Sequence, residues 1–448
     1  MPGIRCARGT CVLVLSLGWL PVLAAQGGTE ARAAAQREDL LAFGRDFLAV
    51  DKAYTPAARA TAEQRLAALT AKAGTISDVR MVLSLAQIVA LADNGHTLMV
   101  SRGSAPEMAR VGIRILPFGD DFVVVQATTD HAELLGGRVV AINDIPIAAV
   151  RDSARTLTGG ITSWRDRMAP AFLESPGQLQ AMGLGTSAMQ ASYRLAMPGG
   201  KSRDVTLTSG QASPRDRQGS VAMLYPASGA GWQSLLPADR APWSLQGAGE
   251  TMRRRDAPEL DAMVVQLRAN VNGQQPIAGF LAESDSLRKA AGRKHIVLDM
   301  RMNGGGNLQL TRDWMQSIVA KLPADGRVVV LTSPSTFSAA ISSVGYLKQA
   351  GGDRVTLVGE APGDRLNFFA EGSPAALPHS GAMFLVAKER HDYQGGCKAY
   401  TDCHRPVVAY PIAVANLDPA VPAPWTAAAY QTGRDPGMEA VARVLGHP

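Results

Sequence analysis

The feature that most constrains the fold is a series of three continuous apolar runs in the carboxyl-terminal half of the chain. Each run has the length of a buried strand, and stretches of helical character, over about residues 307–322 and 338–350, separate them. Apolar strands that alternate with helices are typical of parallel βαβ units. The sequence therefore predicts a parallel α/β core, in which functional loops follow the carboxyl ends of the strands. The predicted strands are His295–Met300, Arg327–Leu331 and Arg354–Val358.

Two segments of different character precede this core. Residues 26–107 are rich in Ala, Leu and Arg, with apolar residues at helical spacing, which predicts a helical amino-terminal part. Residues 108–210 instead carry short alternating strands and a turn at Asn143-Asp144, which predicts a small β-rich module. The rest of the chain, residues 211–448, is then expected to hold the α/β core.

The first 25 residues have the pattern of an export signal. Arg5 and Arg8 form a basic region, Cys11–Leu23 is apolar, and Ala24 and Ala25 are small residues suited to signal peptidase. Cleavage there would remove two arginines and lower the formal net charge from +6 to +4. This modest charge, with no basic stripe interleaved with aromatic residues, argues against nucleic acid as a partner. No apolar run reaches the roughly 18 residues of a membrane span, so we expect an exported protein, periplasmic or secreted, without an integral membrane segment.

Two cysteines, Cys397 and Cys403, would remain after cleavage. In an oxidising compartment a close pair of this kind favours a disulfide that closes a small loop. A zinc site is the alternative, because His391 and His404 place four ligand-capable side chains within fourteen residues. The spacing matches none of the usual zinc patterns, and export favours oxidation. In either case the region is expected to be structural rather than catalytic.

Two loops at the ends of predicted strands carry candidate chemistry. Ser338 stands at the amino end of a predicted helix, where unpaired N–H groups could stabilise an oxyanion, although serine is also an ordinary helix cap. The loop Asn303–Gly306 lacks the lysine of a P-loop and the spacing of a dinucleotide fingerprint, so it is either a plain turn or an oxyanion-binding backbone. His96 follows a predicted helix, and nothing in its local sequence marks it as a base.

Taken together, these motifs resemble the tail-specific (C-terminal-processing) serine protease family. The resemblance rests on Asp299–Gly306 after a strand, on Thr336–Ala340 after the next strand, and on Asp93–Thr97 after a helix. Residues 135–147 resemble the PDZ-like domain of that family, and Gly433–Glu439 resembles the start of its terminal helix. The motifs occur in the family's order and cover nearly all of the chain that follows the signal.

The resemblance implies a serine endopeptidase with a polypeptide substrate and a crotonase-like catalytic core. It also implies that residues 26–107 form a helical cap and that residues 108–210 form a PDZ-like module. Ser338 lies at the position of the nucleophile, and the backbone N–H groups of Gly305 and Ala339 lie where the family forms its oxyanion hole. This chemistry requires neither a metal nor an organic cofactor.

One departure from the family concerns the general base. The processing proteases use a lysine some two dozen residues after the serine, but here Gly359–Arg365 contains none. Arg365 cannot replace it, because a guanidinium does not deprotonate in proteins. Lys348 lies about three turns along the helix that follows Ser338, too far away to reach it.

The tricorn-like branch of the family uses a histidine from the amino-terminal cap, and His96 matches that position. The resemblance therefore implies that His96 takes the proton of Ser338 and passes it to the leaving amine. An acid that orients the histidine is expected as well. Glu360 is a candidate because of its position in the loop after the third predicted strand. Asp93 is near His96 in the sequence, but a role as a turn residue explains it equally well.

Two other functions compete with this one. A catalytically silent relative would bind peptides through the PDZ-like module, and the missing lysine keeps that alternative open. An esterase with the same nucleophile is less favoured, because no G-x-S-x-G elbow surrounds Ser338.

Overall fold

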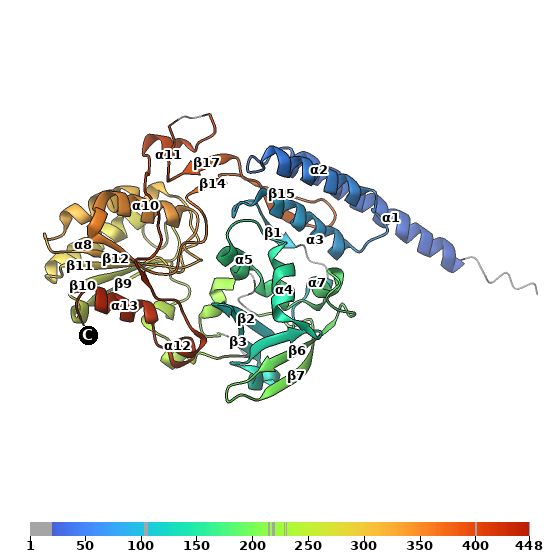
Figure 1. Ribbon diagram of the computed structural model, residues 1–448, viewed down its shortest axis with the longest axis horizontal. Coiled ribbons are helices and arrows are strands. Elements are labelled where there is room, and N and C mark those ends of the chain that lie inside the picture. Colours follow the sequence, from blue (N-terminus) through green and yellow to red (C-terminus); the bar gives the residue numbers. More distant parts are fainter. Residues whose placement is uncertain are drawn as a thin grey trace, which may run out of the picture.

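The computed structural model describes residues 20–102, 106–213, 216, 220–227, 229, 231–398 and 401–447. The fold is of the mixed α/β type, with an α/β core, a β-rich module and a group of amino-terminal helices (Figure 1). Most of the expected signal, residues 1–25, lies outside the described residues, and its last six residues belong to helix α1 (Leu20–Ala42). Within the described ranges, no helix is both long and apolar enough to cross a membrane.

The core is a six-stranded sheet with the strand order β18-β13-β12-β11-β10-β9. The three apolar runs of the sequence form β11, β12 and β13, which pair in parallel as predicted. The outermost strand, β9, instead runs antiparallel to β10, so the sheet is mixed. This edge strand carries the sequence MRRRDA and is only partly buried. A short turn connects it to β10, and so short a connection permits only antiparallel pairing, because parallel neighbours require a much longer crossover. The strands are β9 (Met252–Ala257), β10 (Ala262–Leu267), β11 (His295–Asp299), β12 (Val328–Thr332), β13 (Val355–Gly359) and β18 (Val421–Pro422).

Helices cover both faces of this sheet because its strands are apolar on both sides. Met263 and Val265 of β10 join the apolar cluster of the crossover helices, whereas Val264 between them faces the cluster that holds Val441. The crossover helices share one face, as expected when consecutive parallel strands lie side by side with right-handed connections. They are α8 (Ile277–Ala290), α9 (Gln309–Ser317) and α10 (Ala339–Gly351), and the helix on the opposite face is α13 (Pro436–Val444).

The β-rich module contains a sheet with the strand order β2-β3-β4-β6-β7. Asn143 and Asp144 form the turn between β4 and β5, and both have positive φ (51° and 59°), as the tight hairpin turn predicted here requires. The strands are β2 (Ile113–Phe118), β3 (Asp121–Thr128), β4 (Arg138–Ile142), β5 (Ile145–Pro146), β6 (Gln190–Ala196), β7 (Ser202–Thr208) and β8 (Trp232–Ser234). The helices of this part are α4 (Ile147–Arg155), α5 (Thr162–Met168), α6 (Pro170–Leu173) and α7 (Pro176–Ala181).

The amino-terminal helices α1, α2 (Pro56–Thr70) and α3 (Asp78–Val89) lead to a strand, β1 (Leu98–Arg102). The partner of β1 is β16 (Ala382–Leu385), which comes from the stretch expected to form the core. Figure 1 shows this excursion passing from the core at the left to the helices at the upper right. Its other strands are β14 (Asn367–Ala370), β15 (Pro374–Ala376) and β17 (Glu389–Asp392), and short helices α11 (Arg405–Ala409) and α12 (Ala427–Thr432) follow.

Candidate active site

Ser338 stands at a sharp turn between β12 and helix α10. Its backbone has φ 55° and ψ −127°, a region that non-glycine residues rarely adopt, and strain of this kind tends to occur at functional sites. Although Ser338 occupies the N-cap position, its side chain makes no capping hydrogen bond. The capping alternative therefore does not explain why a serine is present. Ser338 is half-buried, and the next residue, Ala339, begins the first turn of the helix, where N–H groups have no intrahelical partner.

The glycine loop after β11 lies directly against Ser338. A Cβ atom on Gly305 would lie 2.5 Å from the Cβ and 3.1 Å from the Oγ of Ser338. The N–H of Phe337 donates to the carbonyl oxygen of Asn303 at 3.0 Å, which ties the two loops together. The N–H of Gly305 donates to Oδ1 of Asn303 at 2.9 Å, so this expected oxyanion donor has an internal partner. The structure thus brings Gly305, Ala339 and Ser338 together.

Substituting alanine for Gly305 tests how close this approach must be. Gly305 has φ +106°, so Gly305→Ala is strained as well as crowded, whereas Gly304 has open space around its Cβ position. For the peptide hydrolysis that the family resemblance implies, we expect Gly305→Ala to lower kcat/KM by on the order of 10²-fold, the cost of displacing reacting groups by about 1 Å. Gly304→Ala is the matched control. Steady-state kinetics that give the two variants equal activity would contradict the packing of Gly305 on Ser338.

His96 is buried in a slot between two aromatic rings. Its imidazole stacks on Phe337, the neighbour of Ser338, with ring centroids 4.3 Å apart, and on Phe368 at 4.8 Å. Nδ1 lies 3.2 Å from Oδ2 of Asp364, so a protonated Nδ1 donates a hydrogen bond to this carboxylate. Nε2 is buried and has no hydrogen-bond partner among the described residues. An imidazole oriented through Nδ1, with Nε2 unoccupied, is the arrangement a general base needs.

The acid that contacts His96 is Asp364, which was not among the residues singled out from sequence. Glu360, the sequence candidate, has no described contact with His96 and instead lines a cavity of about 230 Å³ between the core and the β-rich module. Burial raises the pKa of Glu360. Asp364 lies four residues further along the same loop, and its side chain is buried beside Gly95. Its position after a buried strand was the available signal, but that signal applied equally to Glu360.

The other charged residues considered from sequence have structural partners. Asp93 has φ 48° and forms a turn, and its carboxylate pairs with Arg165 at 2.5 Å and with Arg365 at 2.8 Å. Arg365 also donates to the carbonyl oxygen of Asp93 at 2.6 Å, and so joins the His96 loop to the Asp364 loop. Lys348 donates to backbone carbonyls at the far end of α10, including that of Val355 at 3.0 Å.

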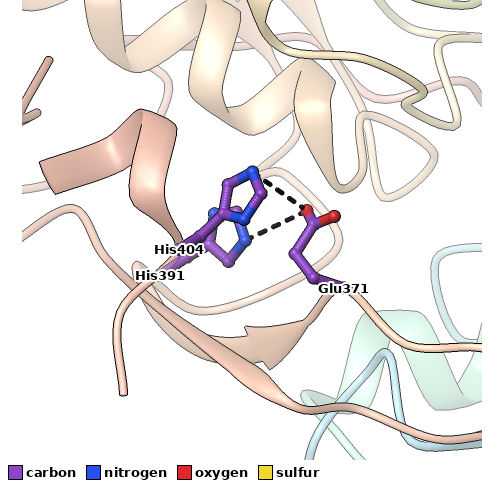
Figure 2. A group of neighbouring side chains, drawn as sticks. All are labelled: Glu371, His391 and His404. Carbon is purple, nitrogen blue, oxygen red and sulfur yellow. Dashed lines mark ion pairs between the residues drawn. The ribbon is translucent and has the colours of Figure 1, made fainter. Parts of the chain in front are cut away.

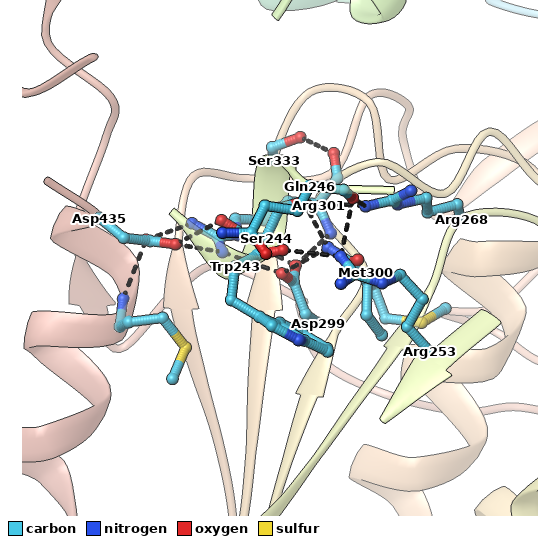
Figure 3. Close-up of polar contacts among 12 residues, drawn as sticks. Trp243, Ser244, Gln246, Arg253, Arg268, Asp299, Met300, Arg301, Ser333 and Asp435 are labelled. Atoms are coloured by element: carbon cyan, nitrogen blue, oxygen red, sulfur yellow. Dashed lines mark hydrogen bonds and ion pairs between the residues drawn. The ribbon is translucent and has the colours of Figure 1, made fainter. Parts of the chain in front are cut away.

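A buried charge network connects the loops that follow β11 and β12 (Figure 3). Arg301 pairs with Asp299 at 2.9 Å and with Asp435 at 2.6 Å, while Ser244 donates to Asp435. Burial by itself would lower the pKa of Arg301, but the charges of Asp299 and Asp435 raise it well above its ordinary value. The hydroxyl of Ser333 donates to the carbonyl oxygen of Arg301 at 2.6 Å. The network therefore links the loop after β11 to the loop after β12 and to the start of α13.

The cysteines predicted to form a disulfide do so. Cys397 and Cys403 are joined, with Cα atoms 5.9 Å apart, which removes both thiolates from the zinc alternative. The two histidines of that alternative lie close to Glu371, and these three residues are a group that could hold a metal ion (Figure 2).

Comparison with solved structures supports the architecture. The chain superposes on a CPAF S499A mutant with a TM-score of 0.60 and on mature CPAF complexed with lactacystin with a TM-score of 0.58. In both cases the identity is 13% and the match covers 93% of this chain and 97% or 98% of the other. At this identity the match shows a shared fold. The photosystem II D1 C-terminal processing protease is matched at 16% identity over 82% of this chain and 86% of that chain, with a TM-score of 0.32, too low to argue from. No protein-family model and no curated protein sequence matches the chain.

Proposed function

We propose that this protein is an exported serine endopeptidase of the tail-specific type, in which Ser338 is the nucleophile and His96 the general base. The observation that carries the proposal is the pair His96–Asp364. The imidazole of this pair stacks on Phe337, which directly precedes Ser338. Ser338 in turn has a strained backbone, and its hydroxyl makes no capping hydrogen bond. A serine, a histidine and a buried carboxylate in these roles define the triad mechanism of acyl transfer. The disulfide between Cys397 and Cys403 supports export, since such bonds persist in oxidising compartments.

In the proposed mechanism the Oγ of Ser338 bonds to the peptide carbonyl carbon while Nε2 of His96 takes its proton. Asp364 accepts from Nδ1 and stabilises the imidazolium that forms. The imidazolium then protonates the leaving amine as the C–N bond breaks, which leaves an acyl group on Ser338. Water hydrolyses this ester with His96 again acting as the base.

The negative charge on the carbonyl oxygen would be held by the backbone N–H groups of Ala339 and Gly305. The N–H of Gly305 now donates to Oδ1 of Asn303. We propose that the oxyanion replaces this amide oxygen, because a charged acceptor forms a stronger hydrogen bond than a neutral one. The N–H of Ala339 lies at the positive end of helix α10, which also favours negative charge.

Residues 108–210 would form the PDZ-like module and residues 211–448 a crotonase-like core, with residues 26–107 as the cap that carries His96. PDZ domains bind a peptide as an added strand at a sheet edge. The cavity between module and core is lined by Phe118 and Arg167 on one side and by Ser335 and Trp425 on the other. A polypeptide held at the module would therefore pass close to the loop that carries Ser338.

The second candidate function is a catalytically silent peptide-binding protein. The observation that favours it is the occupied N–H of Gly305, because an oxyanion hole that never opens would not support acyl transfer.

Active-site labelling with a fluorophosphonate separates the two functions. The folded, purified protein is treated with the probe, digested and mapped, and denatured protein serves as the background control. We expect the label on Ser338 alone, since the probe requires an activated hydroxyl and an oxyanion hole. Folded protein that takes up no more label than the denatured control would support the silent function.

A further inference from the structure

A second group of ionisable side chains lies apart from the Ser338 loop, in the excursion that joins the core to the amino-terminal helices. Glu371, His391 and His404 converge there (Figure 2), with Oε1 of Glu371 lying 3.2 Å from Nε2 of His391 and 3.9 Å from Nε2 of His404. One ligand atom from each residue lies within 4.8 Å of the others. Ligands at 2.0–2.1 Å from a tetrahedral zinc ion are about 3.3–3.5 Å apart, so only small side-chain shifts separate this group from a zinc site.

The other ring nitrogen of each histidine has its own partner. Nδ1 of His404 lies 2.6 Å from Oε2 of Glu389, and Nδ1 of His391 lies 2.7 Å from the hydroxyl oxygen of Tyr393. These contacts orient both imidazoles so that Nε2 points at Glu371 (Figure 2). Metal-bound histidines almost always have such a partner on the second nitrogen, often a carboxylate. The group thus has the surroundings of a ligand set as well as its members.

The backbone holds the three residues in place. His391 lies in β17, paired with Phe368 of β14, and Glu371 follows β14 directly. Glu371 has φ 56°, which is rare for a residue of its type. The disulfide closes the chain between His391 and His404, and the N–H of His404 donates to the carbonyl oxygen of Arg390 at 3.0 Å. Side-chain exposure rises from 3% for His391 to 19% for His404 and 39% for Glu371, which leaves an open side for an ion and a water ligand.

We propose that Glu371, His391 and His404 bind one zinc ion, with a water molecule as the fourth ligand. Two imidazoles and a carboxylate suit zinc, whereas magnesium and calcium prefer oxygen ligands throughout. The ion would contact none of the reacting atoms at Ser338. Binding at this site is independent of the peptidase function proposed above.

The zinc site would also influence His96, and this part of the inference rests on the proposed function. A continuous stack of six rings connects the two places, with neighbouring centroids 3.9–5.0 Å apart. In order, the rings belong to Trp164, Phe337, His96, Phe368, His391 and His404. An ion that fixes His391 also fixes Phe368, which forms one wall of the slot around His96. Zinc would therefore act as a positioning element for the general base.

Isothermal titration of tag-free, chelator-treated protein with ZnCl₂ under non-reducing conditions tests the site. We expect one zinc per chain and no comparable binding of MgCl₂ or CaCl₂. His404→Ala and Glu371→Gln should each weaken binding by at least about 10-fold, and Glu389→Gln by about 10- to 100-fold, as is usual for partners of metal-bound histidines. His379→Ala is the matched control, because His379 also pairs with a glutamate, Glu38, at 2.6 Å but lies outside the group. Absence of zinc binding, or equal binding by the wild type and both ligand variants, would overturn the proposal.

The influence on His96 is measured separately, as the rate of fluorophosphonate labelling with and without zinc. We expect removal of zinc to slow labelling of the wild type and to leave the already slower His404→Ala variant unchanged. Zinc binding with an unaffected labelling rate would refute the positioning role alone. Zinc binding by a protein that never labels would refute the peptidase proposal and leave the metal site standing.

Discussion

Ser338→Ala is expected to lower kcat for peptide hydrolysis by on the order of 10⁶-fold, the loss typical of removing a triad nucleophile. The mechanism requires a covalent acyl-enzyme, which cannot form without Oγ of Ser338, and His96 then has no hydroxyl proton to accept. Peptide binding should persist, because the oxyanion donors and the module are untouched. The measurement is steady-state hydrolysis of an unfolded protein or a quenched peptide by purified wild type and variant, with affinity for an uncleaved peptide measured in parallel.

Ser286→Ala is the control for the nucleophile. Ser286 is an exposed serine of helix α8, and its loss should leave turnover at the wild-type level. Retained hydrolysis in Ser338→Ala would place the nucleophile on another residue.

Asp364→Asn is expected to lower kcat by on the order of 10⁴-fold with little change in KM. The asparagine keeps the shape of the side chain, but its amide no longer supplies the negative charge that orients the imidazole and stabilises the imidazolium. Because the aspartate side chain is 1% exposed and 3.2 Å from Nδ1 of His96, water cannot easily take its place. Kinetics are measured together with thermal unfolding, so that a loss of activity is not confused with a loss of fold.

Glu360→Gln tells which of the two acids serves His96. Glu360 leaves the same strand, β13, but has no described contact with His96, so we expect its variant to keep kcat within about 10-fold of the wild type. A larger loss in Glu360→Gln than in Asp364→Asn would restore the sequence-based candidate. His96→Ala should match Asp364→Asn or exceed it, and full activity in that variant would place the base elsewhere.

Local pattern was enough to predict the parts of the core that position Ser338. Continuous apolar runs predicted strands β11, β12 and β13, because a strand buried on both faces is apolar at nearly every position. The edge strand β9 was not expected, since its arginines and partial burial resemble a surface segment. Strand β10 is completely buried, but it lies upstream of the region where the alternation of strands and helices was recognised.

Long-range contacts were beyond the reach of local pattern. His96 and Asp364 are 268 residues apart, and their meeting depends on the pairing of β1 with β16, which carries the excursion across to the amino-terminal helices. Loops have no periodicity from which such a contact could be predicted. The same excursion brings Glu371 to His391 and His404. The sequence offered two cysteines and two histidines as possible metal ligands. In the structure the cysteines pair with each other, and the ligand group consists of the two histidines and Glu371.

The sequence by itself was enough to predict the α/β core and the turn at which Ser338 stands, and to favour the pairing of Cys397 with Cys403 over a zinc site, because each depends on the burial, backbone conformation or proximity of residues near in the chain. Only the tertiary structure decided which carboxylate holds His96, how closely Gly305 approaches Ser338 and which side chains surround the histidines of the excursion. Those outcomes depend on distances between loops, and such distances are set by how sheets and helices pack rather than by any residue's neighbours in the chain.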